Sequence, residues 1–290
     1  MRRWLNRILS RIRAMFAAPE SINVMRYDIA RLRAVEVARS IELLQWNNPR
    51  FRDPLRLLAS GFQVNSRADD DGMIREIFRR IGTESRVFLE IGVGDGLENN
   101  TAFLLAQGWT GYWLDAGDDF QRRPELQPFL STGQLRATAA FVTRENAAEL
   151  ARRLGVPPSL DLLSIDIDQN TYYVWEALRD LRPRAAVIEY NASIPPDLDW
   201  KVRYAADRIW DRTFNFGAGL KALERLGTEL GYCLVGCDMT GANAFFVRRD
   251  LVGDRFAAPF TAENHFEPPR FELLPSRGHP RTILDPMPPE

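Results

Sequence analysis

Hydrophobic and polar positions alternate with two different periods from residue 86 onward. Short apolar runs, typical of buried parallel strands, are separated by segments with helical spacing. Strands are predicted at 86–92, 110–115, 135–142, 161–167 and 185–190, and an antiparallel hairpin at 231–237 and 243–248. The pattern therefore predicts an α/β fold with a doubly wound, Rossmann-like sheet that is mostly parallel and ends in an antiparallel C-terminal hairpin.

The N-terminal part of the chain has helical periodicity only. Residues 2–16 combine an apolar face with five arginines and predict a basic amphipathic helix. A long helix is expected over 21–46, with Ser21 as its N-cap. Three roles remain open for residues 2–16: contact with a membrane surface, an organellar presequence, or packing against this chain or a partner subunit.

These patterns divide the chain into three parts. We expect a helical extension over residues 1–60, an α/β domain over 61–250 and a proline-rich tail over 251–290. The tail is expected to wrap the surface irregularly or to be partly disordered.

Composition narrows the class of protein. A chain of 290 residues with 45% hydrophobic content can bury the core of one large α/β domain, and a net charge of -1 argues against nucleic acid as a partner. Two cysteines are too few for a disulfide framework and fit a reducing compartment. No apolar run is long enough to predict a membrane span. We expect a cytoplasmic protein, with peripheral contact to the inner membrane surface through residues 2–16 and homo-oligomerisation as open alternatives.

The first predicted strand runs directly into alternating glycines, Gly92, Gly94 and Gly96, with Glu90 two residues before the first. Glycines at this place allow backbone N–H groups to approach a ligand, which favours a nucleoside cofactor. A dinucleotide site would need a third glycine where Leu97 stands, so a nicotinamide cofactor is less favoured. Glu90 within the strand needs a cationic or hydrogen-bonding partner. The amino group of S-adenosylmethionine is a natural candidate.

A second carboxylate supports a nucleoside site. Asp115 ends the second predicted strand, where an acid can accept hydrogen bonds from both ribose hydroxyls. A loop-capping role for Asp115 is the alternative. The full set of candidate cofactor-binding residues is Glu90, Gly92, Gly94, Gly96, Asn100, Asp115 and Phe141.

The fourth and fifth predicted strands both end in polar side chains. Asp166 and Asp168 alternate at the end of one strand, and Glu189 and Asn191 at the end of the other, so all four are candidate catalytic residues in one cleft. Mg²⁺ or Ca²⁺ held by Asp168, Glu189 and Asn191 would compensate the repulsion. Without a metal, Asp166 would help to hold the cofactor, and Asp168 or Glu189 would act as general base. Capping of the next helix is a third explanation.

An insertion over residues 192–219 separates the fifth strand from the last helix and closing hairpin. Insertions at this place commonly cover a substrate. We therefore expect it to form a lid.

The combination of these segments resembles the FkbM-type S-adenosylmethionine-dependent methyltransferases over residues 63–250. The resemblance rests on residues 88–101, Gly108-Trp109, 164–168, 187–191 and 243–248. It implies O-methylation of sugars, polyketides or other glycoconjugate material. Two segments depart from the family pattern, Ser66-Arg67 and Asp168-Gln169-Asn170-Thr171.

The sequence thus predicts an S-adenosylmethionine-dependent O-methyltransferase that acts on a hydroxyl of a small-molecule or glycan substrate. A non-catalytic binding or scaffold protein with the same fold is the first alternative. An NAD-dependent oxidoreductase is the second, and Leu97 and the closing hairpin disfavour it.

Overall fold

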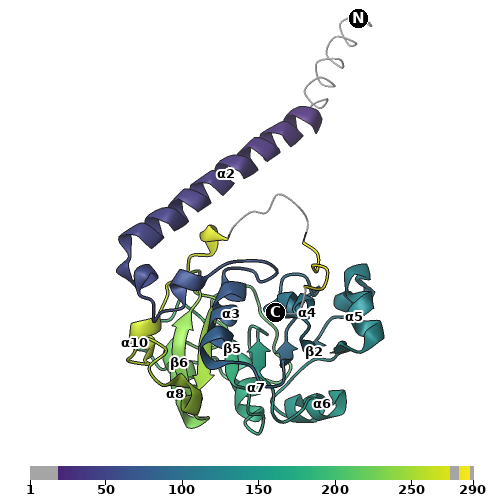
Figure 1. Cartoon of the computed structure of the whole chain (residues 1–290). Coiled ribbons are helices and arrows are strands. Elements are labelled where there is room, and N and C mark those ends of the chain that lie inside the picture. The colour runs from purple at the N-terminus through teal and green to yellow at the C-terminus, as the bar shows by residue number, and fades with distance from the viewer. Residues whose placement is uncertain (1–18, 275–280, 288–290) are drawn as a thin grey trace, which may run out of the picture.

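The structure is a computed structural model that describes residues 19–274 and 281–287. The basic amphipathic helix predicted for residues 2–16 lies outside the described residues. Figure 1 shows a sheet flanked by helices, from which one long helix, α2 (Pro19–Asn47), stands away. Within the described part of the chain, no helix combines the length and the apolar character that crossing a bilayer requires.

The described strands form one seven-stranded sheet. Its members are β1 (Val87–Ile91), β2 (Thr110–Asp115), β3 (Leu135–Ala139), β4 (Leu162–Ile165), β5 (Ala185–Glu189), β6 (Tyr232–Cys237) and β7 (Asn243–Arg248). The strand order is β3-β2-β1-β4-β5-β7-β6, and only β7 runs antiparallel to both of its neighbours. This order confirms the predicted doubly wound, Rossmann-like fold of the methyltransferase type, with its closing antiparallel hairpin.

Helices cover both faces of the sheet, because successive side chains of each central strand point to opposite sides. The bounds of the covering helices are α3 (Asp70–Ile81), α4 (Ala102–Ala106), α5 (Gln127–Thr132), α6 (Ala147–Leu154), α7 (Thr171–Ala177) and α8 (Leu220–Glu229). Phe88 of β1 packs in one apolar cluster with α3, α4 and α5. Leu89 packs in a second cluster with α6, α7 and α8. The central strands are therefore buried on both faces, as their continuous apolar runs predicted.

The structure corrects two details of the N-terminal prediction. Helix α2 is already formed at Pro19, so Ser21 lies inside the helix and is not its N-cap. The polar residues 65–72 predict a loop, followed by a helix from Met73, but helix α3 already begins at Asp70. The residues of α2 that pack against the domain lie in its C-terminal half: Val37 is buried, and Ile41 and Leu44 pack against the apolar cluster that includes Phe88.

The segment after β7 packs along the surface of the domain. It contains the short helices α9 (Arg249–Val252) and α10 (Ala262–His265). Phe256 and Glu267 are buried, and Glu267 forms a 2.7 Å ion pair with Arg50. Contacts of this kind tie residues 250–267 to the segment that follows α2.

Candidate functional site

The glycine loop follows β1 at the carboxyl end of the sheet, and its three glycines have different surroundings. A Cβ atom on Gly92 would lie 1.7 Å from the carbonyl oxygen of Asp166, and one on Gly96 would lie 2.8 Å from side-chain atoms of Leu126 and Trp113. Gly94, with φ +58°, has nothing within 4 Å of the same position. Gly92 and Gly96 therefore allow close packing, whereas Gly94 faces open space.

Glu90 is buried and all of its hydrogen-bond donors come from the chain. The donors are the side chains of Asn99, Thr101 and Ser164, together with the backbone N–H groups of Asn100 (2.9 Å) and Thr101 (3.1 Å). Burial raises the pKa of Glu90 to about 7, although the hydrogen bonds from these donors act to lower it. The hydrogen-bonding partner that the sequence required is thus supplied by the loop leading into α4. Glu90 joins β1, β4 and α4 into one unit.

Asn100 belongs to the same network, whereas Phe141 does not. The Asn100 side chain is buried and donates to the Ser164 hydroxyl at 3.1 Å. Phe141 follows β3 and is 42% exposed. Of these two candidate cofactor-binding residues, only Phe141 presents a side chain that an incoming ligand could cover.

Asp115 lies at the end of β2 and contacts the glycine loop directly. One of its carboxylate oxygens accepts hydrogen bonds from the backbone N–H groups of Val93 and Gly94, both at 2.8 Å. The other accepts from the N–H of Gly117 at 2.7 Å. The oxygen bonded to Gly117 has a second lone pair and can accept a further hydrogen bond, whereas the other oxygen already accepts two. Asp115 therefore both positions the loop and keeps acceptor capacity beside Gly94.

Three of the four predicted catalytic residues come together. Asp166, Asp168 and Glu189 each place one carboxylate oxygen within 4.8 Å of the others. Strand β4 ends at Ile165, so Asp166 and Asp168 lie in the loop beyond it, with Asp168 in the left-handed region at φ +60°. The backbone N–H of Asp168 donates to Glu189 at 2.9 Å. The loop conformation, rather than strand alternation, brings the two aspartates together.

The proximity of these carboxylates perturbs their titration. Burial, followed by the charges of Asp166 and Asp168, raises the pKa of Glu189 well above its ordinary value. Loss of solvation and the charge of Asp168 raise the pKa of Asp166 to about 6, while a hydrogen bond with Glu189 opposes this rise. A hydrogen bond between the two carboxyl groups lowers the pKa of Asp166 and raises that of Glu189, so a shared proton is held preferentially by Glu189.

Arg67 is the nearby cation. Its charge lowers the pKa of Asp166, which is exposed, and of Asp168, which is half-buried, although lost solvation keeps both values above the ordinary one. Arg67 itself is exposed. Arg67 thus places a positive charge beside the carboxylate cluster.

Asn191, the fourth predicted residue, contacts the insertion over residues 192–219. Its side-chain N–H groups donate to the carbonyl oxygens of Phe214 (2.7 Å) and Phe216 (3.0 Å), and its oxygen accepts from the N–H of Ser193. Asn191 therefore holds the insertion, while Asp166, Asp168 and Glu189 form the carboxylate cluster. Asn191 bonds residues near both ends of the insertion, so the presence of an insertion directly after Asn191 was the one feature of the sequence that pointed to this role.

The insertion over residues 192–219 lies against the loop that carries Asp168. The side chain of Gln169 donates to the carbonyl of Asn215 at 3.4 Å, and that of Asn170 to the carbonyl of Ala205 at 3.0 Å. Trp210 is 43% exposed and Phe214 is 75% exposed. The expected lid thus borders the carboxylate cluster and presents aromatic surface to solvent.

A second group of acids, Asp69, Asp70 and Asp71, is buried at the start of α3. The sequence alone placed them in a polar loop. Asp71 accepts hydrogen bonds from three successive N–H groups, those of residues 64–66, and Asp70 accepts from the Asn243 side chain at 2.9 Å. They therefore connect the start of α3 to the β6–β7 hairpin, which no local pattern could have indicated.

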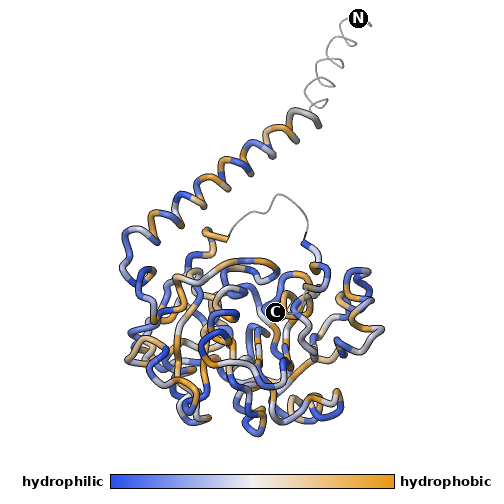
Figure 2. Tube along the Cα trace, in the orientation of Figure 1, coloured by the Kyte–Doolittle hydropathy of each residue, from blue (hydrophilic) through white to orange (hydrophobic). Residues whose placement is uncertain are grey.

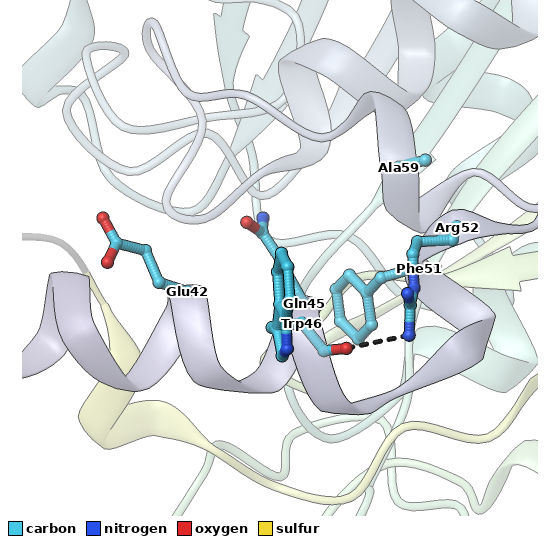
Figure 3. Close-up of a pocket in the computed structure, with 6 residues that line it drawn as sticks. All are labelled: Glu42, Gln45, Trp46, Phe51, Arg52 and Ala59. Atoms are coloured by element: carbon cyan, nitrogen blue, oxygen red, sulfur yellow. Dashed lines mark hydrogen bonds between the residues drawn. The ribbon is translucent and has the colours of Figure 1, made fainter.

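A hollow of about 480 Å³ lies apart from these residues, at the C-terminal end of α2. Figure 3 shows its lining side chains, which come from α2 and the segment that follows it: Glu42, Gln45, Trp46, Phe51, Arg52 and Ala59. The Arg52 guanidinium donates to the carbonyl oxygen of Trp46 at 2.9 Å. This hollow includes none of the predicted site residues.

Comparisons with known proteins add little to this geometry. No protein-family model matches the chain, and no curated protein matches it. Among solved structures, the chain is similar to that of the pyocyanin biosynthetic protein PhzM, with a TM-score of 0.34 and 13% identity, over 60% of this chain and 54% of that one. The match therefore spans about half of PhzM. The sheet order, rather than this likeness, defines the fold.

Proposed function

We propose that this protein is an S-adenosylmethionine-dependent methyltransferase, related to the FkbM-type enzymes, that acts on a hydroxyl of a sugar, glycoconjugate or related metabolite. The observation that carries the proposal is the placement of Asp115, whose carboxylate bonds to the N–H groups of Val93 and Gly94 while Gly94 faces open space. An acid in this position can accept ribose hydroxyls at the carboxyl ends of the strands.

The residues present fit such a cofactor. Asp115 supplies acceptors for a ribose, and the absence of a side chain at Gly94 leaves room for a ligand against the loop backbone. Phe141 offers an exposed ring on the next strand connection along the sheet. Glu90 supports the site indirectly, because its hydrogen bonds fix the segment between the glycines and α4.

The bound cofactor would supply a methyl group activated on a sulfonium. The chain has to align the acceptor, exclude water and remove the hydroxyl proton. Asp166 is suited to take that proton, since its pKa of about 6, set by lost solvation and the neighbouring Asp168, leaves it ionised at neutral pH. Trp210 and Phe214 of the insertion give apolar surface against which the acceptor can pack.

Calorimetric titration of the full chain with S-adenosylhomocysteine tests the cofactor. We expect saturable binding of this ligand and none of NADH. Binding of NADH alone would favour the oxidoreductase, and no binding of S-adenosylhomocysteine by folded protein would refute the proposal.

Transfer is tested with radiolabelled S-adenosylmethionine against fractionated glycans and small-molecule extracts. Labelled product is expected with wild-type protein, and its loss in Asp166→Asn would support the assigned base. Binding without turnover on any fraction would support the scaffold alternative. The same assay with EDTA tests for a metal. Transfer should persist in EDTA if the carboxyl groups share a proton, and it should be lost if Asp168 and Glu189 hold Mg²⁺ or Ca²⁺.

A further inference from the structure

Helix α2 carries an inner apolar stripe that packs against the domain and an outer one that does not, while Val24, Tyr27 and Val35 are exposed outside both stripes. The inner stripe consists of Val37, Ile41 and Leu44. The outer stripe is exposed, each side chain by 48–76%, and consists of Ile22, Met25, Ile29, Leu32, Leu43 and Trp46. Figure 2 shows apolar positions recurring along the full described length of the helix, where it stands clear of the sheet.

The outer stripe has the spacing of a coiled coil. Its residues are separated alternately by three and four positions, which is the a/d pattern of a heptad repeat. Two positions in the middle of the pattern are charged, Glu36 and Arg39, and both are exposed. Within residues 19–274 and 281–287, neither of them forms an ion pair. The stripe therefore has an apolar segment on each side of an unpaired acid and an unpaired base.

We propose that this stripe binds the α2 helix of a second copy of the chain in antiparallel orientation. With a two-fold axis midway between Glu36 and Arg39, each Glu36 faces Arg39 of the second copy. In the same register, Leu32 faces Leu43 of the second copy and Ile29 faces its Trp46. One register thus pairs both charges and covers the apolar side chains on either side of them.

Charge decides between the two orientations. A parallel pair in register would place Glu36 against Glu36 and Arg39 against Arg39, which is unfavourable in a contact that excludes water. In the antiparallel register, the neighbouring positions bring no like charges together, since Arg33 lies near Ser40 of the second copy and Val35 near its Glu42. Polar residues within a heptad seam commonly fix register and orientation in this way.

The size of the contact fits a reversible dimer. The paired segment spans residues 29–46, roughly 27 Å at 1.5 Å per residue. Such a contact buries on the order of 1,000 Å², near the lower limit for a specific interface. Because the inner stripe lies on another side of α2, pairing leaves the packing of each helix on its own domain unchanged. The inference is independent of methyl transfer.

Sedimentation velocity of the full chain over a range of concentrations tests the proposal. We expect a monomer–dimer equilibrium for the wild type. Glu36→Arg and Arg39→Glu should each weaken dimerisation by about tenfold or more, because each creates like-charge pairs. The double variant that exchanges both charges should regain the affinity of the wild type. A parallel dimer would show no such recovery.

A second pair of variants tests the apolar contact. Leu32→Glu combined with Leu43→Glu should be monomeric, and circular dichroism should show an intact fold because both side chains are exposed. Ala38→Glu combined with Gln45→Glu adds the same two charges at exposed positions outside the stripe and should dimerise like the wild type.

Three results would overturn the proposal. The first is a wild-type protein that is monomeric at every concentration, and the second is a double charge exchange that stays as weak as the single ones. The third is a monomeric wild-type protein that co-sediments with anionic vesicles, together with a Leu32→Glu/Leu43→Glu variant that does not. This result would assign the stripe to a lipid surface.

Discussion

Glu90 and Asp115 lie close together at the carboxyl ends of neighbouring strands, yet their surroundings differ. Glu90 is 1% exposed and accepts hydrogen bonds from five groups of the chain. Asp115 is partly exposed and borders the open space at Gly94. Removing one acid should therefore affect folding, and removing the other should affect ligand binding.

Glu90→Ala is expected to lower the free energy of unfolding by about 2–4 kcal/mol, because it leaves the buried N–H groups of Asn100 and Thr101 without an acceptor. Urea unfolding followed by fluorescence measures the change. If stability were unchanged while affinity for S-adenosylhomocysteine fell, Glu90 would instead contact the cofactor directly, as its sequence motif suggests.

Asp115→Asn should weaken binding of S-adenosylhomocysteine by roughly 10- to 100-fold, and it should also lower stability, because its single amide oxygen cannot replace both oxygens that accept the N–H groups of the loop. The variant loses a charged acceptor for ribose hydroxyls, a contribution of about 1.5–3 kcal/mol. Asp118→Asn is the matched control, since Asp118 is 52% exposed and pairs with Arg122. Equal affinities of the two variants in calorimetry would remove Asp115 from the site.

At the scale of elements, the unit of β1, glycine loop and α4 combines close packing with an open face. The surroundings of Gly92 and Gly94 predict opposite consequences for the same substitution. Gly92→Ala would force a Cβ against the carbonyl oxygen of Asp166 and should destabilise the protein by more than about 3 kcal/mol.

Gly94→Ala meets no atom within 4 Å and has only the strain of a left-handed backbone, about 1–2 kcal/mol. The variant should fold, but it should bind S-adenosylhomocysteine poorly, because the added methyl group occupies the open space that a ligand would need. Parallel urea unfolding and calorimetry measure both variants. Comparable stabilities would contradict the different packing described for the two glycines.

The strands and the hairpin could be predicted from the sequence because their burial depends on local apolar runs. The convergence of Asp166 with Glu189 could also be predicted, since parallel strands end at one edge of the sheet. The role of Asn191 could not, because it depends on where the distant carbonyls of Phe214 and Phe216 lie. The same holds for the buried acids of α3, whose partners are up to 173 residues away.

At the scale of the whole molecule, Asp69, Asp70 and Asp238 form a buried acidic group between α3 and the β6–β7 turn. Burial and the charge of Asp238 raise the pKa of Asp69 to about 7 and that of Asp70 well above its ordinary value. A carboxyl group with a raised pKa in the folded state stabilises the protein below its unfolded pKa. That contribution is lost as the pH rises through the folded value.

Asp70→Asn removes one of these charges and keeps an acceptor for the Asn243 side chain. We expect the thermal midpoint of the variant to exceed that of the wild type at pH 8, by a few degrees, with a smaller difference at pH 5. Thermal unfolding from pH 5 to 8.5 measures the difference. A constant difference across this range would show that ionisation of Asp70 does not limit stability.

The internal satisfaction of Glu90 also bears on how chains of this kind evolve. Because the hydrogen bonds of the carboxylate hold β1, β4 and the start of α4 together, Glu90 should be retained for folding in related chains whether or not they catalyse a reaction. The presence of Glu90 therefore indicates that the fold is kept, and not that the chain is active. Changes at Asp115 and Gly94, which border open space, would instead report a change in ligand binding.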